Sequence, residues 1–277
     1  MKKILVTTDF SSNSKAALRF AIQLASQHSF ALTFFHSYHL MRPTKWSDKV
    51  YESFQSSQST VIKNKLTRFV DSVYKSTDVT PKNVAYVIKN SFVTDSNIMQ
   101  YASDNDFNFI CISRRGESKH DKIFGTNTSI LIDQSEVPVI AVPPTYRRSE
   151  ISKVLYASDL VDIEKEVKKV VDFAKPLKAQ IELLHFKVPS DSAGDTKLVE
   201  KAVKKFSDLH IKLDFENLDF AETLLTNLQK AIKKSKPSVV IMFTEQSRSF
   251  FDKLFLSSNT AEYSYHTKIP LLVFPKD

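Results

Sequence analysis

The sequence is poor in the residues that mark several classes of protein: 277 residues include one cysteine and three glycines. Cys111 has no partner for an intramolecular disulfide and lies in the apolar run 107–112, so we expect a buried small hydrophobic residue in a reducing compartment. No apolar run reaches the ~18–20 residues of a membrane span. The first apolar run ends at Thr7-Thr8-Asp9, too early for a signal peptide. We therefore expect a cytoplasmic protein with no membrane partner.

Charge of one sign is also never concentrated. The formal net charge is +8, but basic and acidic residues alternate at helical spacing, as in 164–169 (EKEVKK). A solvated helix face explains this pattern better than a stripe that follows a phosphate backbone. The charge pattern therefore argues against nucleic acid as a partner.

What the sequence does contain is an internal repeat. Residues 3–10 (KILVTTDF) are echoed by 153–160 (KVLYASDL) at an offset of 150, and each segment is an apolar run that ends in an acid. A repeat of this kind indicates that the two halves of the chain have the same architecture. Three further pairs of apolar runs correspond in the same order: 30–36 with 180–185, 107–113 with 238–244, and 136–143 with 268–275.

Within each half, near-continuous apolar strands alternate with amphipathic helices, which indicates a parallel sheet covered on both faces. The third strands are expected at 83–88 and 211–218, and the first half has a long helical segment at 48–74. The Pro-rich stretch 143–149 joins the halves. We predict an α/β protein of two doubly wound parallel-sheet domains, at residues 1–145 and 151–277.

In such sheets a ligand binds outside the carboxyl ends of the strands, where the strand order reverses. Of the loops expected there, the one after the fourth strand holds two of the three glycines, Gly116 and Gly125. Gly125 leads into the helical segment that starts at Thr126-Asn127-Thr128, and a helix N-terminus favours anions. On these residues alone, an ordinary surface loop with a helix cap is an equal alternative. Basic residues stand nearby at Arg114, Arg115, Lys119, His120 and Lys122.

These residues resemble the strand-loop-helix signature of the universal stress protein family, Gly-x2-Gly-x9-Gly-[Ser/Thr]. The chain has Ser113-Arg114-Arg115-Gly116, eight residues, and then Gly125-Thr126, and 138–143 (PVIAVP) closes the domain as in the family. Residues 4–11 (ILVTTDFS) are similar to the family's first strand. The resemblance implies an adenine nucleotide alpha hydrolase-like fold in each half, and an intramolecular pseudo-dimer formed through the last strands, 137–142 and 270–274.

The resemblance also implies a ligand, ATP or a related adenine nucleotide with Mg²⁺, in the first domain. The acid after the first strand would meet the ribose, the end of the second strand the adenine, and the glycine loop the phosphates. Carried over to this sequence, the implied nucleotide-binding residues are Thr7, Asp9, Ser37, Ser113, Gly116, Gly125, Thr126 and Thr128.

Two departures from the signature occur at this loop: Ser113 replaces the first glycine, and the spacer is one residue shorter. If Ser113 had to be left-handed, that conformation would cost ~1–2 kcal/mol. The second half keeps Asp159 but has no glycine in this loop, so degenerate binding is expected there. The corresponding residues are Thr244, Ser247 and Ser257, with Phe250, Phe251 and Phe255 in the same loop and hydroxyls at Ser258 and Thr260.

Other chemistry is not indicated, because the histidines are dispersed and no metal-ligand spacing or nucleophile elbow occurs. His36 and His185 are repeat-equivalent, but one histidine at a strand end is more often structural. We expect a non-catalytic stress-response protein. Two alternatives stay open: a nucleotide-independent scaffold that acts through protein partners, and a slow ATPase. Self-association of pseudo-dimers is compatible with each.

Overall fold

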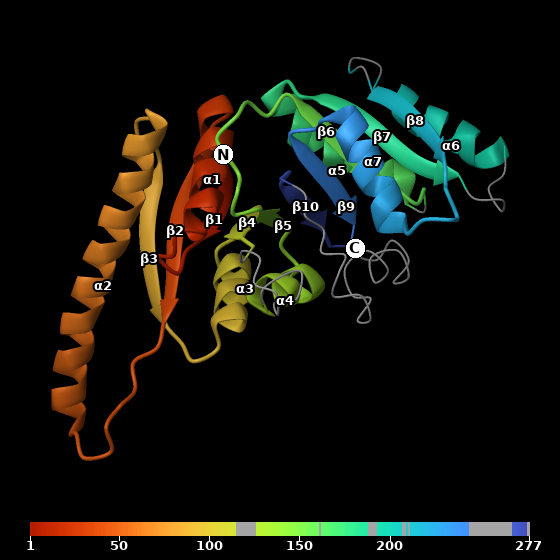
Figure 1. Ribbon diagram of the computed structural model, residues 1–277. Coiled ribbons are helices and arrows are strands. Elements are labelled where there is room, and N and C mark those ends of the chain that lie inside the picture. The colour runs from red at the N-terminus through yellow and green to blue at the C-terminus, as the bar shows by residue number, and fades with distance from the viewer. Residues whose placement is uncertain are drawn as a thin grey trace. The chain divides into compact units, whose positions relative to one another are not determined.

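The computed structural model describes residues 1–114, 126–160, 162–187, 193–206, 209, 211–243 and 268–275. The chain divides into two compact units that meet in the sequence between Arg148 and Ser149. Each unit is an α/β structure built on a parallel sheet, as predicted (Figure 1). The two units are described separately below as unit 1 and unit 2.

In unit 1 the strands lie in the order β3-β2-β1-β4-β5, and every pairing is parallel. The central strands are continuously apolar: Ile4, Leu5 and Val6 of β1 have no exposed surface. A strand that is buried on both faces needs such a run. The elements are β1 (Lys2–Thr7), α1 (Ser14–Gln27), β2 (Phe30–Tyr38), α2 (Asp48–Thr77), β3 (Val84–Asn90), α3 (Thr94–Asp104), β4 (Phe109–Ser113), α4 (Thr126–Gln134) and β5 (Val139–Val142).

Helices cover both faces of this sheet. Phe34 of β2 packs edge-on against Tyr74 of α2, whereas the next residue, Phe35, packs against Tyr101 of α3. Because successive side chains of a strand point to opposite faces, α2 and α3 lie on opposite sides of β2. Cys111 of β4 is completely buried in this core, which confirms the expectation of a small hydrophobic residue.

The long helix α2 begins and ends at recognisable capping residues. The Ser47 hydroxyl accepts a hydrogen bond from the Val50 N–H at 3.4 Å, and Asp78 follows the helix with a left-handed φ of 52°. Residues from Leu66 onward bury one face, whereas most of the side chains in the first four turns are exposed or half-buried. The prediction of a helix over 48–74 is confirmed, with three more residues at its end.

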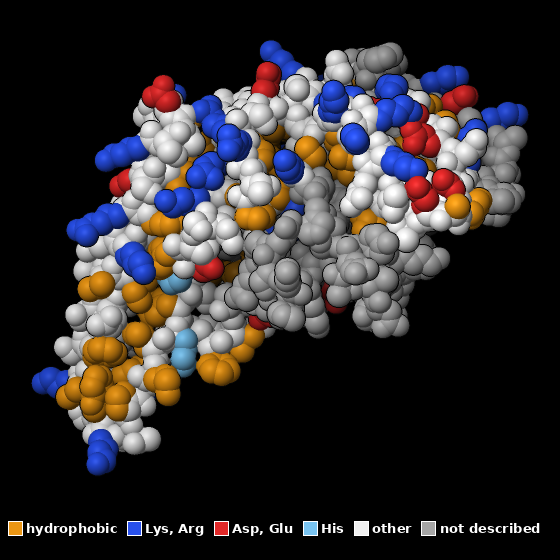
Figure 2. Space-filling view, viewed as in Figure 1, with side chains coloured by type: hydrophobic (Ala, Val, Ile, Leu, Met, Phe, Trp, Pro, Cys, Tyr) orange, Lys and Arg blue, Asp and Glu red, His pale blue; other side chains and the backbone are white. Residues whose placement is uncertain are grey.

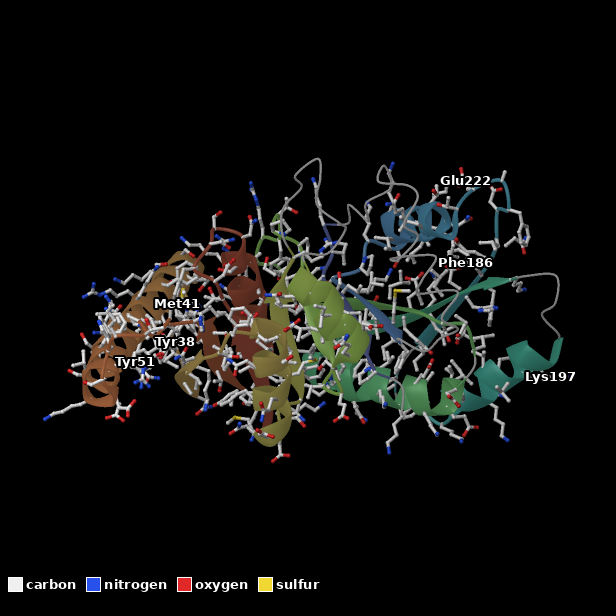
Figure 3. The ribbon with its side chains drawn as sticks, turned by 90° about the horizontal axis from the view of Figure 1, so that it is seen from below. Tyr38, Met41, Tyr51, Phe186, Lys197 and Glu222 are labelled. Atoms are coloured by element: carbon white, nitrogen blue, oxygen red, sulfur yellow. The ribbon has the colours of Figure 1, made fainter. Side chains whose placement is uncertain are left out.

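The loop from β2 to α2 is fixed at the start of the helix. The Tyr51 hydroxyl donates to the Leu40 carbonyl at 3.1 Å, and Arg42 forms an ion pair with Asp48 at 2.6 Å. Tyr38, Met41 and Tyr51 accordingly lie close together (Figure 3). Hydrophobic side chains gather on the surface at this end of α2 (Figure 2), where Met41 is 80% exposed.

Unit 2 repeats the order as β10-β9-β6-β7-β8, again with parallel pairings. The third strands, expected at 83–88 and 211–218, are observed with small shifts of their ends. Residues 244–267, which include the last predicted helix, lie outside the described residues. The elements are β6 (Lys153–Ala157), α5 (Ile163–Ala174), the short 3-10 helix η1 (Lys175–Leu177), β7 (Gln180–Lys187), α6 (Ala193–Lys204), β8 (Ile211–Asn217), α7 (Leu224–Ser235), β9 (Val239–Phe243) and β10 (Leu271–Phe274).

Candidate nucleotide site

The candidate site lies at the carboxyl ends of β1, β2 and β4 in unit 1. The chain passes from β1 to β2 on one side and returns to β4 on the other, so the strand order reverses between β1 and β4. Their register places Val6 beside Cys111, and the segments that leave the two strands therefore start at the same level. This is the position at which open parallel sheets bind ligands.

Asp9 stands in the loop directly after β1, and its side chain is held in place. Oδ1 of Asp9 accepts a hydrogen bond from the Ser11 N–H at 2.9 Å. Burial raises the pKa of this carboxyl, but hydrogen bonds from Ser11 outweigh that effect and the net pKa is lowered. The residue itself is exposed. Asp9 therefore presents a fixed, ionised carboxylate at the carboxyl edge of the sheet.

The loop that carries Asp9 depends on a left-handed residue and on a hydroxyl. Phe10 has a φ of 64°, and its N–H donates to Oγ1 of Thr8 at 3.1 Å. Oγ1 of Thr8 also contacts the Ser14 hydroxyl at 2.8 Å, which ties the loop to the first turn of α1. A left-handed non-glycine residue persists only where neighbouring contacts determine it. Thr7, the residue that ends β1, is buried beneath this loop at 6% exposure.

His36 supports the same loop from the face of the sheet that α2 covers. Its Nδ1 lies 2.8 Å from the Thr8 carbonyl, so Nδ1 carries the proton. The imidazole stacks on Phe10 with ring centroids 4.1 Å apart, and Lys65 of α2 lies 4.6 Å from the Phe10 centroid on the same side. Burial, followed by the positive charge of Lys65, lowers the pKa of His36. Its contacts are those of a structural residue.

Ser37 and a residue that the sequence did not single out, Asn97, form a pair at the end of β2. Nδ2 of Asn97, which lies in the first turn of α3, donates to the Ser37 hydroxyl at 2.9 Å. An amide and a hydroxyl together offer donors and acceptors of the kind that a nucleobase edge requires. No local sequence pattern links residues 60 positions apart, so only the tertiary structure could reveal Asn97.

Ser113 is the last residue of β4. It is not one of the described residues that have a positive φ, so its backbone is not left-handed. Ser113 therefore does not incur the ~1–2 kcal/mol that a left-handed conformation would cost a residue other than glycine. The Ser113 hydroxyl donates to the carbonyl of Asn13 at 2.7 Å, and the Arg114 N–H donates to the Val142 carbonyl at 2.8 Å. These bonds fix the exit of β4 next to the start of α1.

The glycine loop itself is only partly visible. Gly116 and Gly125, together with the basic residues Arg115, Lys119, His120 and Lys122, lie outside the described residues. Helix α4 is described from Thr126 onward. Thr128 is buried, with 3% exposure. Arg114 is buried as well, so it is not one of the exposed cations of this loop.

The loop after β6 in unit 2 has the same supporting contacts as the loop after β1 in unit 1. The Leu160 N–H donates to the Ser158 hydroxyl at 3.0 Å, Leu160 has a φ of 67°, and Nδ1 of His185 lies 2.9 Å from the Ser158 carbonyl. These contacts match those of Phe10, Thr8 and His36. Unlike unit 1, unit 2 places a buried pair beside the loop, because the Tyr156 hydroxyl donates to Glu166.

The remaining sequence-predicted residues of unit 2 cannot be compared, because the segment from Thr244 to Thr260 lies outside the described residues. In the parts of the chain that the structure describes, no group of three or more His, Cys, Asp or Glu side chains could hold a metal ion. None of the described helices combines the length and the apolar composition of a membrane-spanning segment.

Comparisons with known proteins agree with this architecture. The structure is similar to the crystal structure of a universal stress protein from Archaeoglobus fulgidus DSM 4304, with a TM-score of 0.70, 15% identity, and coverage of 99% of this chain and 98% of that chain. It is also similar to a protein of unknown function, PA1789, from Pseudomonas aeruginosa PAO1, with a TM-score of 0.62, 12% identity, and coverage of 100% and 93%.

A third similar structure is a putative universal stress protein from Pseudomonas aeruginosa UCBPP-PA14, with a TM-score of 0.58, 12% identity, and coverage of 99% of this chain and 93% of that chain. At these identities the similarity establishes the fold. No curated protein sequence matches the chain. The family model described as "Universal stress protein family" matches residues 1–143, which is more than half of the chain. The chain therefore belongs to the universal stress protein family.

Proposed function

We propose that unit 1 binds ATP or a related adenine nucleotide at the carboxyl ends of β1, β2 and β4, and that the protein acts as a non-catalytic stress-response binding protein. The observation that carries the proposal is Asp9. Its carboxylate is exposed, oriented by the Ser11 N–H and held ionised at the point where the strand order reverses. A fixed carboxylate there is suited to accept hydrogen bonds from the two hydroxyls of a ribose.

The neighbouring groups supply the other parts of a nucleotide site. Ser37 and Asn97 can exchange their mutual hydrogen bond for bonds to the edge of an adenine. The start of α4 at Thr126 offers backbone N–H groups for phosphates. Mg²⁺ would enter with the nucleotide, held by its phosphates and by water, because the Asp9 carboxylate is assigned to the ribose. The residues present therefore fit an adenine nucleotide.

The absence of catalysis is part of the proposal and rests on Asp9 and His36. A carboxylate whose pKa is lowered is a weak general base at neutral pH. His36 uses Nδ1 to bind the Thr8 carbonyl and stacks on Phe10, on the face of the sheet opposite α3. Neither residue is placed to activate water at a phosphate bound near α4.

For unit 2 we propose that nucleotide binding has been lost. Asp159 and the supporting loop are retained, but the sequence has Thr244, Ser247 and Ser257 at the glycine positions. Without glycine, backbone N–H groups cannot approach phosphates as closely. The buried Tyr156–Glu166 hydrogen bond beside this loop is a further difference from unit 1.

The experiment is to denature the purified protein, identify any released nucleotide by mass spectrometry, and titrate the protein with ATP–Mg²⁺ by calorimetry. Asp9→Asn should weaken binding by roughly 10- to 100-fold, the value of one or two charge-assisted hydrogen bonds. Asp159→Asn, the same change at the equivalent position of unit 2, is the matched control and should leave binding unchanged. If no nucleotide is released and no heat is measured, a scaffold function replaces this proposal.

A further inference from the structure

Helix α2 reverses its polar and apolar sides between its first and second halves. In the second half, the buried residues Leu66, Val70 and Tyr74 face the sheet. In the first half, the residues that continue this side of the helix are polar and line a groove of about 520 Å³ beside Ile88 of β3. The residues of α2 that line the groove are Glu52, Gln55, Ser56, Ser59, Thr60 and Lys63. Packing against the sheet therefore does not explain the apolar side chains of the first half.

Those apolar side chains lie on the outer side of the helix. At about 100° per residue, Phe54 and Val61 lie within about 40° of Val50, whereas the buried Val70 lies about 160° away. Val50 and Val61 are 50% and 58% exposed. Trp46, just before the helix, packs edge-on against Phe54 with ring centroids 5.1 Å apart. Together with the exposed Met41 of the preceding loop, these residues form one apolar surface, the outer stripe, which consists of Met41, Trp46, Val50, Phe54 and Val61.

The outer stripe is carried by a part of α2 that extends past the sheet. Tyr38 is the last residue of β2, and its hydroxyl contacts the Ser59 hydroxyl at 2.8 Å. Residues 48–58 of the helix precede this contact and span about 16 Å. In Figure 1 this end of α2 accordingly projects beyond the ends of β2 and β3. An extended, flat partner can therefore reach the outer stripe without touching the sheet.

Positive charges surround the outer stripe. Lys45, Lys49 and Arg68 are exposed, and within the described residues no ion pair involves any of the three. Arg68 lies about five full turns after Val50, so it is on the same side of the helix. Figure 2 shows Lys and Arg side chains beside the hydrophobic side chains at this end of α2.

Negative charges in this part of the chain are neutralised or lie on the other side of the helix. Asp48 forms an ion pair with Arg42 at 2.6 Å, and Glu52 lines the groove. Residues 53–70 contain neither Asp nor Glu. The outer stripe is thus an apolar surface bordered by cations, which is complementary to a partner that is both apolar and anionic.

We propose that the outer stripe binds the surface of a lipid bilayer that contains anionic lipids, with the first half of α2 lying along the surface. Helices that bind in this way place Trp, Phe and aliphatic side chains at the boundary between headgroups and acyl chains, and their Lys and Arg side chains among the anionic headgroups. Nucleic acid would use the cations but leave the apolar residues exposed.

The sequence-based expectation of no membrane partner rested on the lack of a spanning segment. A helix that lies on a bilayer needs no such segment. The outer stripe includes neither Asp9 nor the Ser37–Asn97 pair, so this proposal is independent of nucleotide binding.

Co-sedimentation with vesicles tests the proposal. The wild-type chain should bind vesicles of phosphatidylcholine with about one third phosphatidylglycerol, and bind pure phosphatidylcholine much more weakly. Each basic residue near an anionic surface contributes about fivefold in affinity. Lys45→Glu/Arg68→Glu should therefore weaken binding to the mixed vesicles at least roughly 25-fold.

Lys63→Glu/Lys82→Glu is the matched control, because it changes the net charge by the same amount away from the outer stripe. Lys63 lines the groove, about 140° from Val50, and the exposed Lys82 lies just before β3. This control should bind within about threefold of wild type. Val50→Ser/Val61→Ser tests the apolar part and should weaken binding roughly tenfold. Circular dichroism checks that each variant is folded.

Trp46 reports whether the outer stripe makes the contact, because it is the single tryptophan of the chain. Its emission should shift to shorter wavelength on the mixed vesicles and be quenched by lipids with brominated acyl chains. The proposal is overturned if the wild-type chain does not bind the mixed vesicles, which would favour an acidic protein as partner. It is also overturned if pure phosphatidylcholine binds equally well, if the two charge variants behave alike, or if Trp46 emission is unchanged in bound protein.

Discussion

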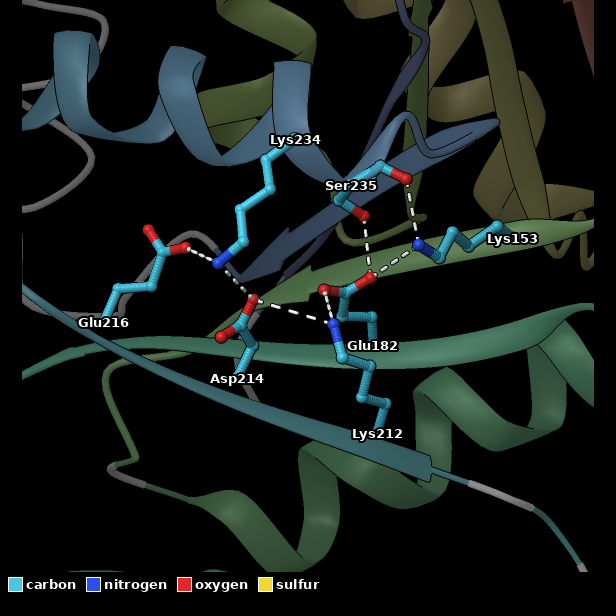
Figure 4. A network of polar contacts seen from close by, with 7 residues as sticks. All are labelled: Lys153, Glu182, Lys212, Asp214, Glu216, Lys234 and Ser235. Carbon is cyan, nitrogen blue, oxygen red and sulfur yellow. Dashed lines mark hydrogen bonds and ion pairs between the residues drawn. The ribbon is translucent and has the colours of Figure 1, made fainter.

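Removing one charge from the interior of unit 2 should selectively destabilise that unit. Glu182 of β7 is 2% exposed, and its carboxylate is bonded to Lys153 at 2.7 Å, Lys212 at 2.8 Å and Ser235 at 2.8 Å (Figure 4). Burial raises the pKa of this carboxyl, but the three hydrogen bonds outweigh it and lower the pKa from 4.5 to about 2. The predicted perturbation is Glu182→Gln.

The magnitude follows from the pKa. A folded-state pKa of about 2, against 4.5 in the unfolded chain, corresponds to about 3 kcal/mol of stability at neutral pH. Lys212 is 55% exposed, so solvent screens part of that interaction and about 2 kcal/mol is the better figure. Because the folded-state pKa is depressed, this stabilisation is fully present above pH 4.5, the ordinary pKa of the unfolded chain. It is lost as the pH falls from there toward 2.

Native-state hydrogen exchange of β6 and β7 measures this effect within unit 2. At pH 7, about 2 kcal/mol corresponds to roughly 30-fold faster exchange in Glu182→Gln. Glu216→Gln is the control, because Glu216 belongs to the same network but pairs with Lys234, which is 62% exposed. Circular dichroism across the acid range should show the difference between wild type and Glu182→Gln closing as the pH falls from 4.5 toward 2. Equal exchange in the two variants, or a difference that persists at pH 2, would refute the reasoning.

Three further outcomes are expected. Because burial removes Cys111 from solvent and raises its pKa, maleimide should label it only after unfolding; rapid labelling of the folded protein would contradict the buried assignment. Ser47→Ala removes the N-cap of α2 and should lower stability by about 1 kcal/mol in urea denaturation followed by Trp46 fluorescence, and an unchanged midpoint would argue against the cap. Burial and Lys65 depress the pKa of His36, so its stabilisation is present above pH 6.5 and lost as the pH falls through the depressed value; an NMR titration midpoint above 6.5 would reverse the sign.

The sequence was sufficient for the features that depend on periodicity. The alternation of apolar strands with helices predicted the parallel sheets, and the long helix was placed from its first residue at Asp48. The offset of about 150 residues extends to individual contacts, because Thr8 and Ser158 play the same part in their loops. These features depend mainly on residues that are close together in the sequence, so the order of apolar and polar residues is enough to predict them.

Features that depend on distant contacts were not visible in the sequence. Asn97 reaches Ser37 only because α3 packs beside the end of β2. Ser113 is still within β4, where it pairs with Val142, so its backbone is not left-handed, and its hydroxyl bonds to Asn13, 100 residues away; no spacing rule could indicate either contact. Glu182 lies in β7, whose sequence is predominantly apolar, and the residues that bond to its carboxylate come from three other elements.

The asymmetry between the two units is the central claim, and a single titration tests it most directly. Calorimetry of ATP–Mg²⁺ against wild type, Asp9→Asn and Asp159→Asn gives both the stoichiometry and the unit responsible. One nucleotide per chain, with an affinity that falls in Asp9→Asn and is unchanged in Asp159→Asn, is the predicted result. Two equivalent sites, a loss confined to Asp159→Asn, or no binding at all would contradict the account.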